Sequence, residues 1–265
     1  MREFSLTVMK LKFTLRTRFK KDIVAEFVPP TRKSNKVMIF ASGMPSVPSR
    51  KELMYTFAKK GYWVFFPRYR GSWESGGVFL EKSPHEDILD VIDQIPKGFT
   101  SIWDKKEYKV TPSTIHIIGS SFGGPAALLA ARDPRVEKVI AVSPVVDWCA
   151  PSKAEPMDWL YGFTKDAFGN GYRISKKNWN KMQNGTFYSP LAHTKEIPGE
   201  KVFIIHAQDD ESVGWRPVEK FAKKINCKLL LLKRGGHLGI GDMMKKSSAR
   251  KKIETFLKTR QKQGR

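Results

Sequence analysis

A serine stands in the motif Gly119-Ser-Ser121-Phe-Gly123, between an expected strand at 114–118 and an expected helix at 124–132. A serine on a tight turn from strand to helix is held exposed at the carboxyl edge of a parallel sheet, and flanking glycines permit backbone packing that a Cβ would obstruct. The amino terminus of the following helix also stabilises a developing oxyanion. This arrangement predicts that Ser121 is the nucleophile of an acyl-transfer reaction.

A serine hydroxyl is a weak nucleophile at neutral pH, so it needs a histidine base and a carboxylate that orients the base, in the chain order serine, acid, histidine. An expected strand at 202–206 leads into a loop where we select Asp210 as the acid, with Asp209 or Glu211 as alternatives. An expected strand at 228–232 leads into Gly235-Gly-His237, which makes His237 the predicted base. One His237 ring nitrogen should lie within hydrogen-bond reach of Ser121 Oγ while the other faces Asp210. The other histidines are predicted to be surface or core residues: His85, His116, His193 and His206.

Acyl transfer also needs two backbone donors for the oxyanion, usually the amide after the nucleophile and one from the loop after an earlier strand. Phe122 supplies the first. The turn at 42–45 follows an expected strand at 37–41, so Met44 is the preferred second donor, and we expect Gly43 to shape the turn beside the substrate. A plain turn is the alternative interpretation of this segment.

The elements that must position these residues alternate between strand and helix from residue 37 onward, which predicts a parallel sheet with crossover helices. We expect an α/β fold of about eight strands, the first ones antiparallel, with strands at 10–19, 23–28, 62–67 and 136–142 beside those already named. Further helices are expected at 50–60, 84–95, 217–225 and 243–258. The whole chain, 1–265, should form a single domain.

Residues 148–198 break this alternation and are rich in aromatic side chains. We interpret them as an insertion or small cap after the sixth strand, and expect Trp148, Trp159 and Tyr161 to line a substrate pocket, because loops at the carboxyl ends of parallel strands build ligand sites. The alternative is that most of these aromatic side chains form the segment's own small core.

Composition limits the choice of function. The 265 residues are 40% hydrophobic, which excludes a disordered chain, and 48 Lys and Arg against 26 Asp and Glu give a net charge of +22. That charge supports an alternative function, nucleic-acid or anionic-surface binding on an inactive scaffold, with basic runs such as 32–36 and 245–252 on the phosphates. However, lysines are spread along the whole chain and no nucleic-acid reading motif accompanies them, so we expect no specific nucleic-acid partner.

The sequence predicts no cofactor and no membrane span. Its two cysteines form neither a disulfide framework nor a zinc motif, which favours a reducing, cytoplasmic location. No apolar run approaches the roughly 18 residues of a spanning helix. No metal cluster, P-loop or dinucleotide-binding motif is present.

The motifs resemble those of the α/β-hydrolase superfamily, and within it the catalytic domain of prolyl oligopeptidase family serine peptidases, together with dienelactone hydrolase-like esterases. The similar segments occur in the expected order over about residues 22–258. They are Ser42-Gly-Met-Pro45, Tyr69-Arg-Gly-Ser72, the motif around Ser121, Tyr188-Ser-Pro-Leu191, Ile205-His-Ala-Gln-Asp-Asp210 and Gly235-Gly-His237.

The resemblance implies a serine hydrolase with Ser121 as nucleophile, Asp210 as orienting acid and His237 as base. The expected substrate is a small ester or short peptide with an apolar acyl or side-chain group, cleaved through an acyl-enzyme. The chain lacks the large N-terminal propeller of these peptidases, so esterase, thioesterase or lipase-like activity is as compatible with the sequence as peptidase activity.

Overall fold

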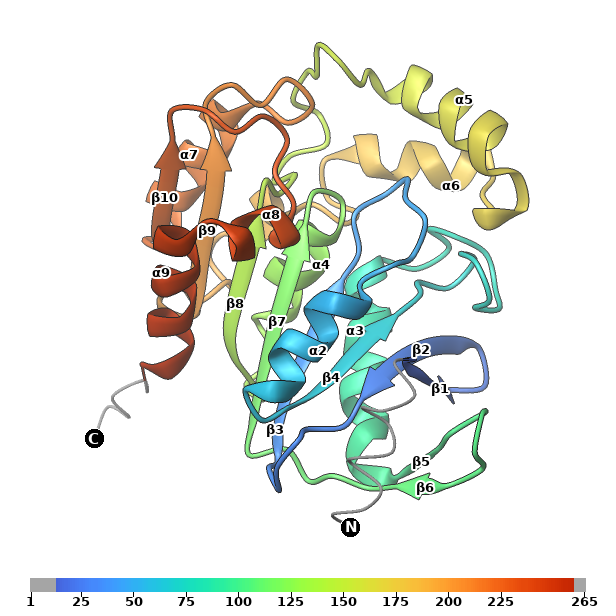
Figure 1. The fold of residues 1–265 in the computed structure, drawn as a ribbon. Helices are drawn as coiled ribbons and strands as arrows, with labels where there is room; N and C mark the ends of the chain where they lie inside the picture. Colours follow the sequence, from blue (N-terminus) through green and yellow to red (C-terminus); the bar gives the residue numbers. More distant parts are fainter. Residues whose placement is uncertain (1–12, 260–265) are drawn as a thin grey trace.

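The computed structural model describes residues 13–259, and their central feature is an eight-stranded sheet in the order β1-β2-β4-β3-β7-β8-β9-β10 (Figure 1). The strands of this sheet are β1 (Leu15–Phe19), β2 (Ile23–Val28), β3 (Lys36–Ala41), β4 (Tyr62–Pro67), β7 (Thr114–Ser120), β8 (Val136–Val142), β9 (Val202–Ala207) and β10 (Lys228–Leu232). β2 is antiparallel to both β1 and β4, and the other neighbouring pairs are parallel. The predicted α/β fold and its antiparallel beginning are therefore confirmed.

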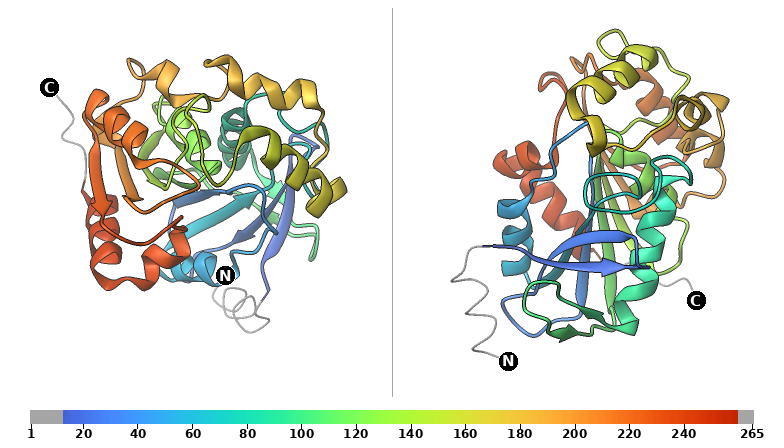
Figure 2. Two further views of the ribbon diagram at one scale, coloured as in Figure 1. Left: turned by 90° about the horizontal axis from the view of Figure 1, so that it is seen from above. Right: turned by 90° about the vertical axis from the view of Figure 1, so that its right-hand side faces the viewer.

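Helices cover both faces of the sheet because side chains alternate along each strand. In β3, Val37 and Ile39 join the core on one face, with α3 (Pro84–Gln94), α4 (Gly123–Ala130) and α7 (Trp215–Lys224). Met38 and Phe40 join the core on the other face, with α2 (Lys51–Lys59), α8 (Ile240–Lys245) and α9 (Ser247–Lys258). The two helical layers are visible on either side of the sheet in Figure 2.

Most predicted elements occur within a few residues of their expected bounds. Local chemistry sets several of them: Glu86 Oε1 accepts a hydrogen bond from the Ser83 amide ahead of α3, and Gly61 follows α2 at φ 84°. The predicted single helix at 243–258 is wrong, because Lys246 is extended (φ −76°, ψ 109°) and separates α8 from α9. A short hairpin, β5 (Phe99–Thr100) with β6 (Glu107–Tyr108), was not expected. Of the predicted strand at 10–19, residues 10–12 lie outside the described residues.

The segment between β8 and β9 lies over the carboxyl ends of the parallel strands (Figures 1 and 2). It contains α5 (Met157–Phe168) and α6 (Lys176–Asn180). Short 3-10 helices complete the segment: Gly169–Gly171, Lys181–Asn184, Pro190–His193 and Gly199–Lys201; a further one, Ile95–Lys97, follows α3. Within residues 13–259, no helix is long and apolar enough to cross a membrane.

Candidate active site

Ser121 occupies a strained turn between β7 and α4. Its φ is 53°, in the left-handed region that residues with a Cβ rarely adopt. The Ser121 amide donates to the Val142 carbonyl at 3.0 Å, and the Gly124 amide donates to the Ser121 carbonyl at 2.9 Å. A Cβ built on Gly119 would lie 2.1 Å from the Gly123 carbonyl oxygen, so glycine is required there for the turn to pack. The motif therefore forms the tight turn from strand to helix that its context predicted, with Ser121 partly exposed.

Asp210 and His237 form a hydrogen-bonded pair at the same edge of the sheet, after β9 and β10. His237 Nδ1 lies 2.9 Å from Asp210 Oδ2 and 3.1 Å from Oδ1, so Nδ1 carries the proton that is donated. Asp210 Oδ1 also accepts from the amides of Ser212 and Val213, at 3.0 and 2.9 Å. The Asp210 side chain is fully buried, whereas 30% of the His237 side chain is exposed. A buried carboxylate therefore fixes the tautomer and orientation of an accessible imidazole.

Burial and charge oppose each other in the pKa values of this pair. Burial lowers the pKa of His237, but the hydrogen bond and charge of Asp210, assisted by Glu155, raise it above its ordinary value. Burial raises the pKa of Asp210, but hydrogen bonds from His237 and Val213, with the charge of His237, bring it below the ordinary value. The two shifts keep Asp210 ionised and make the His237 ring bind a proton more readily than an ordinary histidine does.

Among residues 13–259, Ser121 and His237 share no hydrogen bond, so the predicted contact between nucleophile and base is not formed in this structure. Two other contacts hold the loop that carries His237. Asp209 Oδ1 accepts from the Gly236 amide at 2.8 Å, and Ser143 Oγ accepts from the Leu238 amide at 3.1 Å. Hydrogen bonds between nucleophile and base commonly tighten only in the complex with substrate.

The amides of Met44 and Phe122 meet one requirement of an oxyanion hole: neither donates a hydrogen bond within the described part of the chain. The Phe122 carbonyl accepts from the buried Tyr188 hydroxyl. The Ser42 carbonyl, in the other turn, accepts from the Tyr69 hydroxyl at 3.1 Å. A buried tyrosine hydroxyl thus donates a hydrogen bond to a carbonyl of each turn. Burial raises the pKa values of both tyrosines, which keeps their hydroxyls neutral and able to donate.

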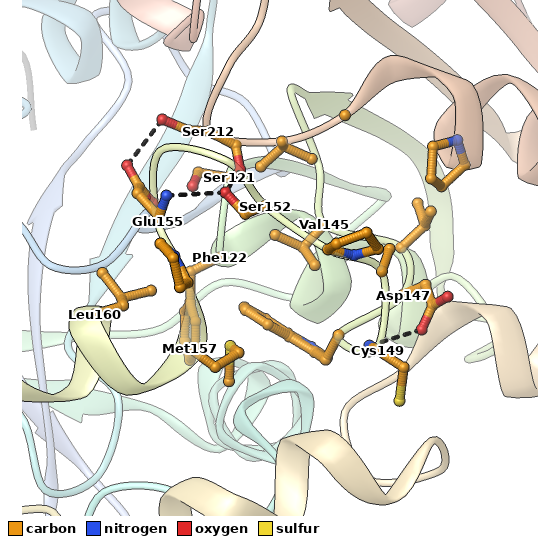
Figure 3. A pocket seen from close by; sticks show the side chains of 18 of the residues that line it. Ser121, Phe122, Val145, Asp147, Cys149, Ser152, Glu155, Met157, Leu160 and Ser212 are labelled. Atoms are coloured by element: carbon orange, nitrogen blue, oxygen red, sulfur yellow. Dashed lines mark hydrogen bonds between the residues drawn. The ribbon is translucent and has the colours of Figure 1, made fainter.

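A cavity of about 430 Å³ opens beside Ser121, within the range of small-molecule sites. Figure 3 shows Ser121 with Ser152, Glu155 and Ser212 grouped in one part of the view, and Asp147 and Cys149 in another. Its apolar lining comprises Met44, Phe122, Val145, Val146, Trp148, Met157, Leu160, Val213 and Val218, among others. Residues 13–259, including those that line the cavity, contain no group of three or more His, Cys, Asp or Glu side chains that could hold a metal ion.

The residues predicted to contact substrate do not all line the cavity. Trp148 lines the cavity and donates from Nε1 to the Tyr188 carbonyl at 2.9 Å. A Cβ on Gly43 would lie 3.5 Å from Ser121 Cβ, so that turn closely approaches the nucleophile. Trp159, 51% exposed, stacks on Phe163, while Tyr161 packs against Trp179, and neither is among the residues that line the cavity. Substrate contact remains a prediction for all of them.

His206 is a supporting residue that the sequence interpretation treated as ordinary core. Its Nε2 donates to the Val213 carbonyl at 2.9 Å and lies 3.4 Å from Asp210 Oδ2, and its side chain is fully buried. Burial is the largest influence on His206 and lowers its pKa, which keeps the ring neutral. The signal available in the sequence was its position four residues before Asp210 at the end of the same strand.

The sheet, its helical layers and the strained serine turn define an α/β-hydrolase. The prolyl oligopeptidase family profile matches residues 48–262, most of the chain, and this chain therefore belongs to the prolyl oligopeptidase family. A search of curated protein sequences finds no match.

Solved structures with the same fold include peptidases and esterases. The acylaminoacyl peptidase of Pyrococcus horikoshii superposes with a TM-score of 0.61 at 19% identity over 96% of this chain, which spans only 42% of that peptidase. The Pyrococcus furiosus esterase Pf2001 gives a TM-score of 0.65 at 18% identity, with 95% of this chain and 93% of the esterase covered. Est1E from Butyrivibrio proteoclasticus gives 0.59 at 16% identity, with 93% and 99% covered. At such identities the likeness establishes the fold.

Proposed function

We propose that Ser121, Asp210 and His237 form the catalytic triad, and that the enzyme cleaves small esters or short peptides through an acyl-enzyme. The observation that carries the proposal is the Asp210–His237 pair, which follows β9 and β10 at the sheet edge where Ser121 occupies its strained turn. The amides of Met44 and Phe122 form the oxyanion hole in this proposal. The cavity beside Ser121 holds the acyl group.

In the reaction, Ser121 Oγ attacks the substrate carbonyl carbon while His237 Nε2 takes the hydroxyl proton. The charge that develops on the carbonyl oxygen is stabilised by the two amides and the amino terminus of α4. His237 then gives its proton to the departing alcohol or amine, which leaves an ester on Ser121. Water attacks this ester as His237 takes one of its protons. His237 then returns that proton to Ser121 Oγ as the bond between Oγ and the acyl carbon breaks, which releases the carboxylic acid and restores the free hydroxyl.

The proposal is tested by labelling the purified protein with a fluorophosphonate probe and by assaying nitrophenyl esters and aminoacyl amides. Ser121→Ala should abolish both labelling and turnover. Ser120→Ala is the matched control, because Ser120 is the adjacent serine of the same motif but belongs to β7 and is only 7% exposed. Equal labelling of wild type and Ser121→Ala, or none in the wild type, would overturn the proposal. The relative rates on esters and amides would separate esterase from peptidase activity.

A further inference from the structure

The cavity beside Ser121 has an unusual charge for this protein. Basic residues outnumber acidic ones by 48 to 26 in the chain, yet the charged residues that line the cavity are Asp147 and Glu155, both acidic. The pocket therefore carries the opposite sign to the protein as a whole. A net charge of +22 repels cations from the general surface, so this acidic site in an apolar pocket is a local exception.

Glu155 is held in place by neighbouring serines. Ser212 Oγ donates to Glu155 Oε1 at 2.8 Å, the Glu155 amide donates to Ser152 Oγ at 3.0 Å, and Ser152 Oγ donates to the Ser212 carbonyl at 2.8 Å. These bonds tie the start of the segment after β8 to the loop that carries Asp210 (Figure 3). The carboxylate of Glu155 is thus oriented before any ligand arrives, which lowers the entropic cost of binding.

Neither carboxylate of the cavity is neutralised by a basic side chain in the part of the chain that the structure describes. Asp147 Oδ1 accepts from the Cys149 amide at 2.9 Å, and Glu155 has only its serine partner. Glu155 also lies close enough to the reaction centre for its charge to help raise the pKa of His237. A partly enclosed carboxylate without a cationic partner attracts a cation strongly, because the surrounding protein screens the charge less than bulk water does.

We propose that this cavity selects an acyl group with an aliphatic stem and a positively charged end, such as a lysine- or arginine-like side chain, and that Glu155 is the residue that determines this specificity. The inference rests on the proposed function, since the cavity is defined relative to Ser121. Apolar lining residues, Val145 and Met157 among them, pack against the methylene groups. Glu155 pairs with the ammonium or guanidinium group by a charge-assisted hydrogen bond.

The test compares two substrates that differ in one charge, the Nα-acetyl methylcoumarin amides or nitrophenyl esters of lysine and norleucine. The wild type should hydrolyse the lysine substrate with kcat/KM about 10- to 100-fold above norleucine, as expected for one charged hydrogen bond in a shielded site. Glu155→Gln should abolish this preference by lowering kcat/KM for the lysine substrate to that for norleucine, because glutamine keeps an acceptor for Ser212 and loses only the charge.

Asp158→Asn is the matched control. Asp158 is three residues further along the chain and its side chain is 86% exposed and pairs with Lys176, so its removal changes the net charge equally but should leave the preference intact. A wild type that prefers norleucine, or a lysine preference that survives Glu155→Gln, would overturn the inference.

A binding measurement separates this inference from the proposed triad. Pentylammonium should bind to the Ser121→Ala protein in calorimetry at least tenfold more tightly than pentanol, and Glu155→Gln in that background should remove the difference. This result would support the cation site even if labelling of Ser121 failed. Equal affinity for the amine and the alcohol would refute it even if Ser121 were the nucleophile.

Discussion

Replacement of Asp210 by asparagine should place His237 in the wrong tautomer while the loop that carries residue 210 stays folded. Asparagine keeps an oxygen that can accept from the amides of Ser212 and Val213, the two backbone bonds that Asp210 Oδ1 receives. At the other position it places an NH₂ group where Oδ2 now accepts from His237 at 2.9 Å. His237 Nδ1 must then accept and not donate, which moves its proton to Nε2. An imidazole in that tautomer cannot take the proton of Ser121.

The expected loss follows from this contact. A hydrogen bond to a charged group is worth about 1.5–3 kcal/mol, and the cost of the wrong tautomer adds to it. We expect kcat/KM to fall about 10³- to 10⁴-fold, equivalent to about 4–5.5 kcal/mol of transition-state stabilisation. The same factor should appear in the rate of fluorophosphonate labelling, since both reactions need an activated serine. The midpoint of thermal unfolding should change little.

Asp209→Asn is the control for this experiment. Asp209 precedes Asp210 and accepts from the Gly236 amide through Oδ1, a bond that asparagine retains. Its kcat/KM should stay within about threefold of the wild type, a change of under 1 kcal/mol. If Asp210→Asn keeps activity within about tenfold of the wild type, or if Asp209→Asn loses as much, the assignment of Asp210 as the orienting acid is wrong.

Three further outcomes are expected. The base must be neutral to act and the pKa of His237 is raised, so kcat/KM should fall on acidification with a midpoint above the ordinary histidine pKa of about 6.5. A pH–rate profile with a lower midpoint would contradict the pairing of His237 with Asp210. Gly123→Ala should destabilise the fold by about 1–3 kcal/mol in urea unfolding, since its Cβ would meet the Ala41 carbonyl oxygen at 2.2 Å, whereas Gly162→Ala, in an open position of α5, should stabilise it by about 0.5–1 kcal/mol. Burial, with the charges of Lys36 and Lys138, lowers the pKa of His116 to about 4. As the pH falls, the unfolded chain therefore takes up a proton before the folded protein does, and up to about 3 kcal/mol of stability should be lost between pH 6.5 and 4. In urea unfolding, the stability of His116→Gln should depend less steeply on pH over this range.

The sequence predicted most of the fold because its signals are local. Short apolar runs located most of the strands, and the strand bounds at 62–67, 136–142 and 228–232 agree with β4, β8 and β10. The extended backbone at Lys246 was missed because no glycine or proline marks it. The hairpin of β5 and β6 was missed because two-residue strands are too short to show a period.

Chain order and motif context were sufficient to select Ser121, Asp210 and His237, because turns and loops at the carboxyl ends of parallel strands must meet at one edge of the sheet. Residue types alone also determined that the protein carries a large positive charge. What the tertiary structure decided was which groups surround those residues. Glu155 is held at the cavity by hydrogen bonds with serines that lie 3 and 57 residues away in the chain. The Tyr188 hydroxyl donates to the carbonyl of Phe122, 66 residues away. Such contacts depend on how the segment between β8 and β9 folds back over the sheet, and no local pattern of residues specifies that path.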